Sequence, residues 1–513
     1  MLRVVETENG FVQGLPAADP RVTSFKGIPF AAPPIGENRW RAPQPCENWE
    51  GIRLAYEFAP ISMQDTPGIG DDIYCREWHV DPEIPMDEDC LYLNVWTNAK
   101  TVDANLPVLV WFFGGAFQWG YTAEMEFDGE RIARRDIVVV QVNYRLGAFG
   151  FLSHPEITSA QSDAPANFGH LDQQAGLRWV KRNIKAFGGN PDNITIAGQS
   201  AGGGSVLAQL ACLDNDGDFQ KAVIFSAMIN SPYKTPSLIA PKTLAENERV
   251  GKEFFEFLGV NSLEEARKLD AFYIRDKYGE FAASKGNFLA MDGRFLSCID
   301  DKFMKMNPMK AFFTGDRVKV PVMSGNTADE FLDVIFAKDD VEYEEKVKEI
   351  FGDYAEEFMK YPESKVKIPM GYAPINGIEL TTKAAFLAEE NNDNKQDCYY
   401  YRFNPHIPGE DNPGTFHSVD LWFFFETLAK CTRPYTGKYY DLARQMCNYF
   451  SNFIKNGNPN GADIDGTMMP EWKPYTKNSK NEMEFTTDGA VAKVEDYKLK
   501  ELLIKNITEE FLQ

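Results

Sequence analysis

A serine between two glycines, in the segment AGQSAGGGS, is the first group in this sequence whose setting suggests covalent chemistry. Ser200 follows a run of β-branched residues and precedes a run of small ones, which is typical of a strand that turns sharply into a helix. Gly198 and Gly202 lack the Cβ atoms that would obstruct such a turn. The pattern therefore predicts that Ser200 points outward as a nucleophile, with the N–H groups of the following helix near its target.

A serine hydroxyl becomes a nucleophile when a neighbouring base takes its proton, and histidine is the usual base. The chain has five histidines. His417, in GTFHSVDLWFFF, lies well beyond Ser200, with a turn residue before it and a hydrophobic run after it. In enzymes that carry this serine turn, the chain order is serine, acid, histidine. His417 is therefore the predicted base, and an acid is expected between the two.

The segment VPVMSGNTADEF offers that acid. Residues 320–323 have the pattern of a short buried strand, which Gly325 and Asn326 are expected to end. Asp329 and Glu330 then follow on a loop beyond this strand. The residue pattern leaves both carboxylates as candidates.

Acyl transfer also requires N–H donors for the oxyanion that forms on the substrate, and one such donor is worth about 3 kcal/mol. The segment PVLVWFFGGAFQWG has a strand pattern at residues 108–112 that runs straight into Gly114, Gly115 and Ala116. Small residues let the backbone approach a scissile carbonyl closely. Neither glycine-rich segment has the spacing of a nucleotide-binding loop. The pattern predicts an oxyanion hole and a reaction that needs no cofactor.

With these pieces assembled, the chain resembles the type-B carboxylesterases, the family that includes cholinesterases, bacterial p-nitrobenzyl esterases and the non-catalytic neuroligins. The resemblance covers nearly the whole length and implies an α/β-hydrolase fold. The segments that carry it are FKGIPFAAPPIGENRWRAPQP from residue 25, EDCLYLNVW from residue 88, NYRLGAFGF from residue 143, NFGHLDQQAGLRWVKRNIKAFGGNP from residue 167 and DLARQMCNYFSNFIKNGNPN from residue 441.

The resemblance also implies a role for individual positions. Ser200 matches the family nucleophile, Glu330 the acid and His417 the base. The N–H groups that match the family's oxyanion hole are those of Gly115, Ala116 and Ala201.

Two further positions stay open at this point. Asp329 remains the alternative acid because it is adjacent, although the phenylalanine that follows, Phe331, favours Glu330 in the match. Ser226, in VIFSAM, matches a family serine that lies near the histidine, and a plain buried hydroxyl is the alternative interpretation.

The chain departs from the family where the usual H-G-G-G is replaced by Phe113, Gly114, Gly115 and Ala116. Phe113 removes a polar group beside the oxyanion hole. Ala116 keeps its N–H donor, but its methyl group takes up room that a third glycine would leave for a crowded alcohol. The sequence therefore predicts poor turnover of esters of tertiary alcohols.

The distribution of strand and helix patterns indicates one α/β domain, residues 1–513, with a sheet wrapped by helices. No linker separates the segments that carry chemistry, which extend from residue 114 to residue 417. Helical patterns at residues 177–187 and 243–258 are each followed by a glycine, as a helix end requires. Approximately residues 230–315 are expected to form a helical insertion in the active-site wall. The strand patterns lie at residues 108–112, 137–142, 194–197, 221–225, 320–323 and 398–403.

Composition excludes several classes of partner. The formal net charge of −23 would repel nucleic acid and anionic membrane surfaces. No apolar run approaches the ~18 residues of a membrane-spanning helix, and the N-terminus MLRVVETENGFVQG has no signal-peptide core. These features predict a cytoplasmic protein that acts on a small molecule. The oligomeric state is not readable from the sequence.

Charged and sulfur-containing residues have structural interpretations. In the family, Glu88, Arg145 and Asp172 resemble members of buried ion pairs. In secreted members of the family, the cysteine that corresponds to Cys90 forms a disulfide with a cysteine further upstream. In this chain Ser62 occupies the position of that upstream cysteine. Cys75 could replace it, although both thiols are expected to be free in a reducing compartment. A metal site built from Cys75, His79 and Cys90 fits no zinc spacing.

The predicted function is that of a serine carboxylesterase working through an acyl-enzyme on Ser200. The expected substrates are p-nitrophenyl esters and small to medium esters with apolar or aromatic groups, hydroxycinnamate esters among them, because aromatic residues flank the motifs. A binding protein on the same scaffold and a hydrolase of amides or thioesters are the alternatives. Retention of all three triad residues favours an enzyme over a binding protein.

Overall fold

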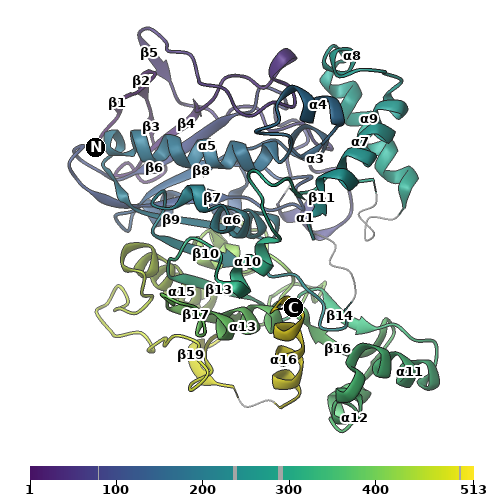
Figure 1. Cartoon of the computed structure of the whole chain (residues 1–513). Coiled ribbons are helices and arrows are strands. Elements are labelled where there is room, and N and C mark those ends of the chain that lie inside the picture. Colours follow the sequence, from purple (N-terminus) through teal and green to yellow (C-terminus); the bar gives the residue numbers. More distant parts are fainter. Residues whose placement is uncertain (79, 235–239, 287–292, 496–497, 513) are drawn as a thin grey trace.

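The computed structural model describes residues 1–512 except 79, 235–239, 287–292 and 496–497. A large, mostly parallel sheet runs through the molecule (Figure 1). Neighbouring strands from β8 to β18 are parallel, whereas the strands at both ends of the sheet are antiparallel. In spatial order the strands are β19 (Gly489–Val494), β18 (Asn481–Thr486), β17 (Cys398–Phe403), β13 (Val322–Thr327), β10 (Lys221–Phe225), β9 (Gly189–Gln199), β7 (Leu106–Phe112), β8 (Val138–Val142), β6 (Tyr92–Thr97), β4 (Thr23–Pro29) and β3 (Leu15–Pro16).

The central strands are buried on both faces, which is why they are continuous hydrophobic runs. Along β7, alternate side chains enter two different hydrophobic clusters. Val108, Val110 and Phe112 join one cluster, and Leu109 and Trp111 join the other. The sheet therefore separates two cores, each of which needs a layer of helices to cover it.

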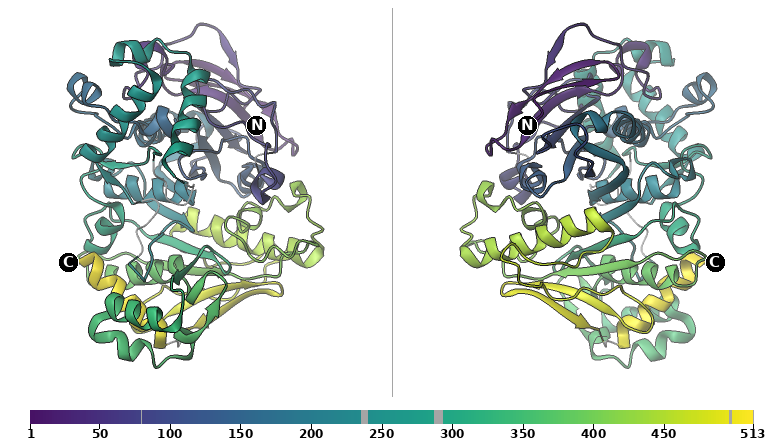
Figure 2. Two further views of the ribbon diagram at one scale, coloured as in Figure 1. Left: turned by 90° about the vertical axis from the view of Figure 1, so that its right-hand side faces the viewer. Right: turned by 90° about the vertical axis from the view of Figure 1, so that its left-hand side faces the viewer.

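Helices supply both layers, as the two side views show (Figure 2). Side chains of α5, α6, α10, α13 and α16 fill one cluster, and those of α3, α7, α14 and α15 fill the other. The helices are α1 (Ile73–Glu77), α2 (Glu130–Ala133), α3 (Gly147–Phe151), α4 (Pro155–Ala160), α5 (Phe168–Asn183), α6 (Ala201–Ala211), α7 (Leu244–Leu258), α8 (Leu263–Arg267), α9 (Ala271–Lys285), α10 (Pro308–Thr314), α11 (Asp340–Phe351), α12 (Ala355–Phe358), α13 (Gly377–Glu389), α14 (Leu421–Phe424), α15 (Gly437–Asn456) and α16 (Lys498–Leu512).

Among the described residues, three smaller sheets lie outside the main one. One contains β1 (Val4–Thr7), β2 (Gly10–Gln13) and β5 (Ile52–Leu54), and a second joins β11 (Lys242–Thr243) to β12 (Cys298–Ile299). The third contains β14 (Leu332–Ile335), β16 (Gly371–Asn376) and β15 (Lys367–Ile368). In Figure 1, the third sheet and helices α11 and α12 lie at the lower right.

Within residues 230–315 the structure describes helices α7, α8, α9 and α10, and α7 to α9 stand together at the upper right of Figure 1. Residues 235–239 and 287–292 of this segment lie outside the described residues. Helix α7 begins after Thr243, whose side chain accepts the N–H of Glu246, and ends before Gly259, which has φ +74°. These are the boundaries that the sequence pattern predicts.

The predicted end of the strand at residues 320–323 is wrong. Gly325 and Asn326 were expected to end their strand, but β13 continues through both residues to Thr327. A Cβ atom on Gly325 would lie 2.2 Å from the carbonyl oxygen of Tyr401 on the adjacent strand β17. Gly325 is therefore required by close packing between strands, and not by a turn.

A search of the described helices finds none that is both long enough and apolar enough to span a membrane.

Candidate active site

The segments singled out in the sequence meet at one edge of the sheet. Strands β7, β9, β10, β13 and β17 are consecutive neighbours and run parallel. The glycine-rich segment follows β7, Ser200 follows β9, Glu330 follows β13, and His417 lies on the segment that follows β17. Because the carboxyl ends of parallel strands share an edge, residues far apart in the sequence come together there.

Ser200 occupies a strained turn between β9 and α6. Its backbone has φ +55° and ψ −124°, a conformation that is costly for a residue with a Cβ atom. An added Cβ on Gly198 would lie 2.2 Å from the carbonyl oxygen of Gly202, and one on Gly202 would lie 2.1 Å from that of Phe112. The two glycines therefore permit the turn and let helix α6 approach the end of β7.

The glycine-rich segment after β7 passes next to Ser200. A Cβ on Gly114 would lie 3.3 Å from the Cβ of Ser200, so the two segments are in direct contact. Gly115, Ala116 and Phe117 all have positive φ, at +106°, +54° and +61°. In the described part of the chain, the N–H groups of Gly115, Ala116 and Ala201 donate to no other residue. They remain available to a substrate oxygen.

Glu330 and His417 are in direct contact. Oε2 of Glu330 lies 2.5 Å from Nδ1 of His417, and Oε1 accepts the N–H of Thr327 at 3.1 Å. Asp329 is used differently, because its carboxylate accepts both the N–H and the hydroxyl of Thr415. Of the two acids left open by the residue pattern, Glu330 is the one that contacts the imidazole.

Burial and charge act in opposite directions on the imidazole of His417. Burial lowers its pKa, but the charge of Glu330 and the bond to it outweigh burial, with a further contribution from Asp420, so the pKa is raised above 6.5. Nε2 of His417 lies 3.1 Å from the amide nitrogen of Gln199. No hydrogen bond joins Ser200 to His417 among the described residues, and catalytic bonds are often long before substrate binds.

Three residues around His417 were not identified from the sequence. The ring of Phe331 lies against the imidazole, with centroids 4.8 Å apart, and Tyr74 donates its hydroxyl to the carbonyl of His417 at 3.1 Å. Gln199 is the third. Gln199 and Phe331 are each next to a predicted triad residue, and that adjacency was the one available signal.

Asp420 is a fourth group that sequence reasoning missed, three residues after His417. It is fully buried, and one of its oxygens accepts the hydroxyl of Tyr401 at 2.7 Å. Burial raises the pKa of this carboxyl to about 7, and the negative charge of Glu330 adds to the effect. Ser226 is also fully buried, and its hydroxyl has no hydrogen-bond partner among the described residues. Among the described residues, no hydrogen bond joins Ser226 to His417, so its role stays a prediction.

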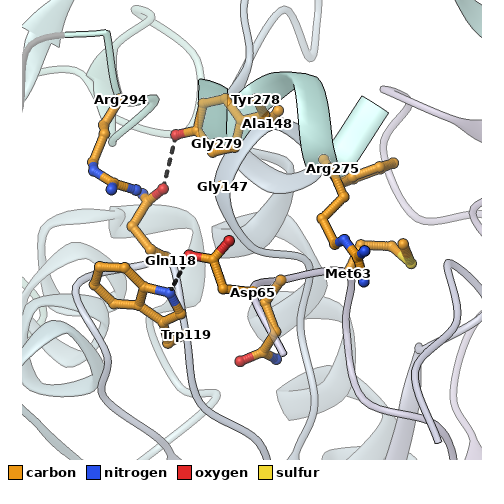
Figure 3. A pocket seen from close by; sticks show the side chains of 12 residues that line it. Met63, Asp65, Gln118, Trp119, Gly147, Ala148, Arg275, Tyr278, Gly279 and Arg294 are labelled. Atoms are coloured by element: carbon orange, nitrogen blue, oxygen red, sulfur yellow. Dashed lines mark hydrogen bonds between the residues drawn. The ribbon is translucent and has the colours of Figure 1, made fainter. Parts of the chain in front are cut away.

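A small hollow lies beside the predicted oxyanion segment, against helix α9 (Figure 3). Tyr278 of α9 donates its hydroxyl to Gln118 at 2.7 Å, and Trp119 donates its indole N–H to Asp65 at 2.9 Å. The guanidinium of Arg294 stacks over the ring of Trp119. The insertion is therefore tied to the residues that directly follow Ala116.

The charged residues of the motifs form buried ion pairs, as predicted. Arg39 contacts Glu88 at 2.6 Å, and Arg145 contacts Asp172 at 2.7 Å. Cys75 and Cys90 are both free thiols in this structure. His79 lies outside the described residues, and no group of histidine, cysteine and acidic side chains within the described part could hold a metal ion.

A doubly covered parallel sheet, a strained serine after a central strand, and an acid and a histidine in contact at the same edge together define an α/β-hydrolase. A model of the carboxylesterase family matches residues 2–373 and 373–502. The chain therefore belongs to the carboxylesterase family, and it is a carboxylic ester hydrolase.

Similar proteins agree with this assignment. The para-nitrobenzyl esterase of Bacillus subtilis (strain 168) is 31% identical over 493 residues, which cover 92% of each chain. The fumonisin B1 esterase of Sphingopyxis macrogoltabida is 32% identical over 445 residues, covering 83% of this chain and 75% of that protein. The solved structure of a PNB esterase has a TM-score of 0.77 at 27% identity, covering 98% of this chain and 100% of the other.

Proposed function

We propose that the protein hydrolyses carboxylic esters through an acyl-enzyme on Ser200, with His417 as the base and Glu330 as the acid. The contact of 2.5 Å between Glu330 and His417, at the sheet edge where Ser200 lies, is the observation that carries the proposal. As Oγ of Ser200 attacks the ester carbonyl, Nε2 of His417 takes the hydroxyl proton. Glu330 stays ionised and stabilises the imidazolium.

The tetrahedral oxyanion accepts hydrogen bonds from the N–H groups of Gly115, Ala116 and Ala201. His417 then returns its proton to the departing alcohol, and the acyl group remains on Ser200. A water molecule then attacks the acyl-enzyme while His417 takes a proton from that water. As the bond between the acyl carbon and Oγ breaks, His417 returns the proton to Oγ of Ser200 and the carboxylic acid leaves. No cofactor takes part in either half.

The proposed substrates are p-nitrophenyl esters and small to medium esters with apolar or aromatic groups. Trp119 and Phe416 support this class, because both are half-buried near the predicted site. Phe117 and Trp422 also flank the motifs, but they are buried in the core and carry less weight. Hydroxycinnamate esters form one subclass, which methyl ferulate tests against methyl butyrate.

The helical insertion, approximately residues 230–315, is proposed to form part of the active-site wall. The contact of Tyr278 and Arg294 with the segment after Ala116 supports this proposal. A cytoplasmic location stays a prediction from the sequence.

The test is p-nitrophenyl butyrate hydrolysis by the wild type, by Ser200→Ala and by Ser159→Ala, an exposed serine on α4 that serves as the control. Each is assayed before and after treatment with a serine-reactive organophosphate. We expect Ser200→Ala to lose about 1,000-fold or more of the activity and to take up no label. Activity retained in Ser200→Ala would place the nucleophile elsewhere. Rates on matched ester, thioester and anilide substrates separate esterase from thioesterase or amidase activity.

A further inference from the structure

Phe331 is a large exposed side chain in direct contact with the predicted catalytic base. It follows Glu330 in the chain, and 62% of its surface is exposed. Its ring lies 4.8 Å from the imidazole of His417, measured between centroids, with 40° between the planes. A single exposed phenylalanine needs no functional explanation. Phe331 differs from such a residue because one face of its ring lies against the imidazole of His417.

The backbone on both sides of Phe331 is held in place. On one side, Glu330 accepts the N–H of Thr327 and contacts His417. On the other side, Leu332 pairs with Asn376 of β16, and the half-buried carboxylate of Asp333 accepts hydrogen bonds from Ser231 and from the N–H of Gly377. The ring therefore projects from a fixed support into solvent, and it does not belong to a free loop.

Contact with the imidazole has two physical consequences. The ring excludes water from one face of His417, which strengthens the attraction between the imidazole and the carboxylate of Glu330. The face of an aromatic ring also attracts a cation, so the imidazolium that forms during the reaction is favoured over the neutral base.

The position of the ring also defines which half of the substrate it meets. In the proposed function, His417 delivers a proton to the departing alcohol oxygen, so the alcohol group leaves beside the imidazole. The ring of Phe331 lies on the imidazole and most of its surface is exposed, so it adjoins the departing alcohol group. Burying such a surface against hydrocarbon is favourable.

We propose that Phe331 is a positioning residue for His417, and that its open face binds an apolar or aromatic alcohol group of the ester. This inference rests on the proposed function. It narrows the substrate class to esters whose apolar group is carried by the alcohol.

The test compares benzyl acetate with methyl acetate, which share an acyl group and differ in the alcohol. The variants are Phe331→Ala, Phe331→Leu and the control Phe336→Ala, an exposed phenylalanine just past β14. Phe331→Ala should lower kcat/KM for benzyl acetate about tenfold more than for methyl acetate. Phe331→Leu should recover most of the preference because leucine restores apolar bulk. Phe336→Ala should match the wild type.

The pH dependence of kcat/KM distinguishes a positioning role of Phe331 from a merely structural one, because a structural role would leave the acid limb unchanged. The other titratable groups around His417 are Glu330, Asp420 and Tyr74, and the substitutions at Phe331 leave all three in place. Both Phe331 variants lose the aromatic face, so the acid limb of kcat/KM should move to lower pH for both substrates. If Phe331→Ala does not fold, the acid limb of kcat/KM for Phe331→Leu tests the positioning role.

An unchanged substrate ratio together with an unchanged acid limb would overturn the inference, as would an equal loss on both esters with the limb unmoved. A wild type that hydrolyses neither acetate and takes up no organophosphate contradicts the proposed function itself, which is a different result.

Discussion

The imidazole of His417 meets a different group on each side, and this arrangement defines the chemistry of the site. A carboxylate contacts Nδ1, an amide lies near Nε2, and an aromatic ring covers the face. Burial lowers the pKa of His417, but the charge of Glu330, its hydrogen bond and the charge of Asp420 together raise the pKa. Two predictions concern single residues of this site.

As the proposed base, His417 must be neutral to accept the serine proton, so activity should fall on the acid side. Its pKa is raised above 6.5, so the acid limb of kcat/KM should lie above that pH. In Glu330→Gln the raising charge is lost and burial lowers the pKa, so the limb should move below 6.5. The rate at the optimum should also fall about 1,000-fold or more. Profiles with p-nitrophenyl butyrate between about pH 5 and 9 test this.

Glu349→Gln, an exposed acid on α11, is the control and should reproduce the wild-type profile. A Glu330→Gln profile superimposable on that of the wild type would mean that another group controls the protonation of the base.

Ala116 should limit the size of the alcohol. Its methyl group lies where the family usually has glycine, so the wild type should hydrolyse t-butyl acetate much more slowly than n-butyl acetate. Ala116→Gly should reduce this rate ratio about tenfold. Ala373→Gly is a matched control, because Ala373 also has positive φ, at +49° against +54°, and lies on β16. Comparable rates of the wild type on both acetates would contradict the prediction.

At the scale of elements, the junction of β9 and α6 fixes the geometry of the site. Backbone atoms of the turn and of the end of β7 approach so closely that side chains are excluded at Gly198 and Gly202. Helix α6 can therefore begin directly beside the segment that carries the predicted oxyanion donors. Because of this close approach, the glycines of α6 differ in whether they can be replaced by a residue with a side chain.

Gly202→Ala should destabilise the protein, whereas Gly204→Ala should not. A Cβ on Gly202 would meet the carbonyl oxygen of Phe112 at 2.1 Å, and backbone cannot move aside cheaply. We expect a cost of about 3 kcal/mol or more. A Cβ on Gly204 would meet Phe117 at 3.5 Å, an ordinary contact, and the change should gain up to about 1 kcal/mol of helix propensity. Thermal unfolding of the two variants compares them directly, and equal melting temperatures would refute the argument.

Strand positions were largely readable from the sequence because parallel strands buried on both faces are continuous apolar runs. The predicted strands at residues 221–225 and 398–403 coincide with β10 and β17. The strand at residues 320–323 was placed too early and ended too soon, because the pattern cannot distinguish a glycine that turns the chain from one that packs against a neighbouring strand. The small sheet of β14, β16 and β15 was not predicted.

The candidate site was predictable to the extent that its residues lie in short motifs. Ser200, Glu330 and His417 each follow a recognisable segment, and their positions at one sheet edge follow from the order of the strands. The contacts of Gln199 and Phe331 and the burial of Asp420 depend on which way side chains point in the folded protein. Local sequence does not encode that information.

At the scale of the whole molecule, a buried charge cluster fastens the C-terminal elements to the sheet. Lys383 of α13 is fully buried and contacts Glu379, Glu482 of β18 and Glu495, at 2.8, 3.0 and 2.5 Å. Lys500 of α16 contacts two of these carboxylates, Glu379 and Glu495. The pKa of Lys383 is raised, because the attraction of these acids outweighs the opposing effect of burial. The cluster connects α13, the strand next to the edge of the sheet, and α16.

Lys383→Met should therefore destabilise the protein strongly, because it removes the cation that contacts Glu379, Glu482 and Glu495 together. Removing one partner of a buried ion pair costs about 3–5 kcal/mol. Lys505→Met on α16 is the control, because that side chain is 56% exposed and its ion pair with Glu509 is 3.9 Å long. Chemical denaturation at neutral pH measures both, and a Lys383→Met midpoint equal to that of Lys505→Met would show that the cluster contributes no stability.

The order of the strands has a consequence for the protein as it is synthesised. Ser200 leaves the ribosome first, Glu330 follows, and His417 emerges last of the three. At that stage β18, the strand that pairs with β17 in the finished sheet, has not yet been synthesised. Until His417 emerges, Ser200 is an ordinary alcohol without a base. A nascent chain stalled before residue 417 should be inert toward organophosphates. Labelling of ribosome-bound chains of increasing length would therefore time the completion of the fold.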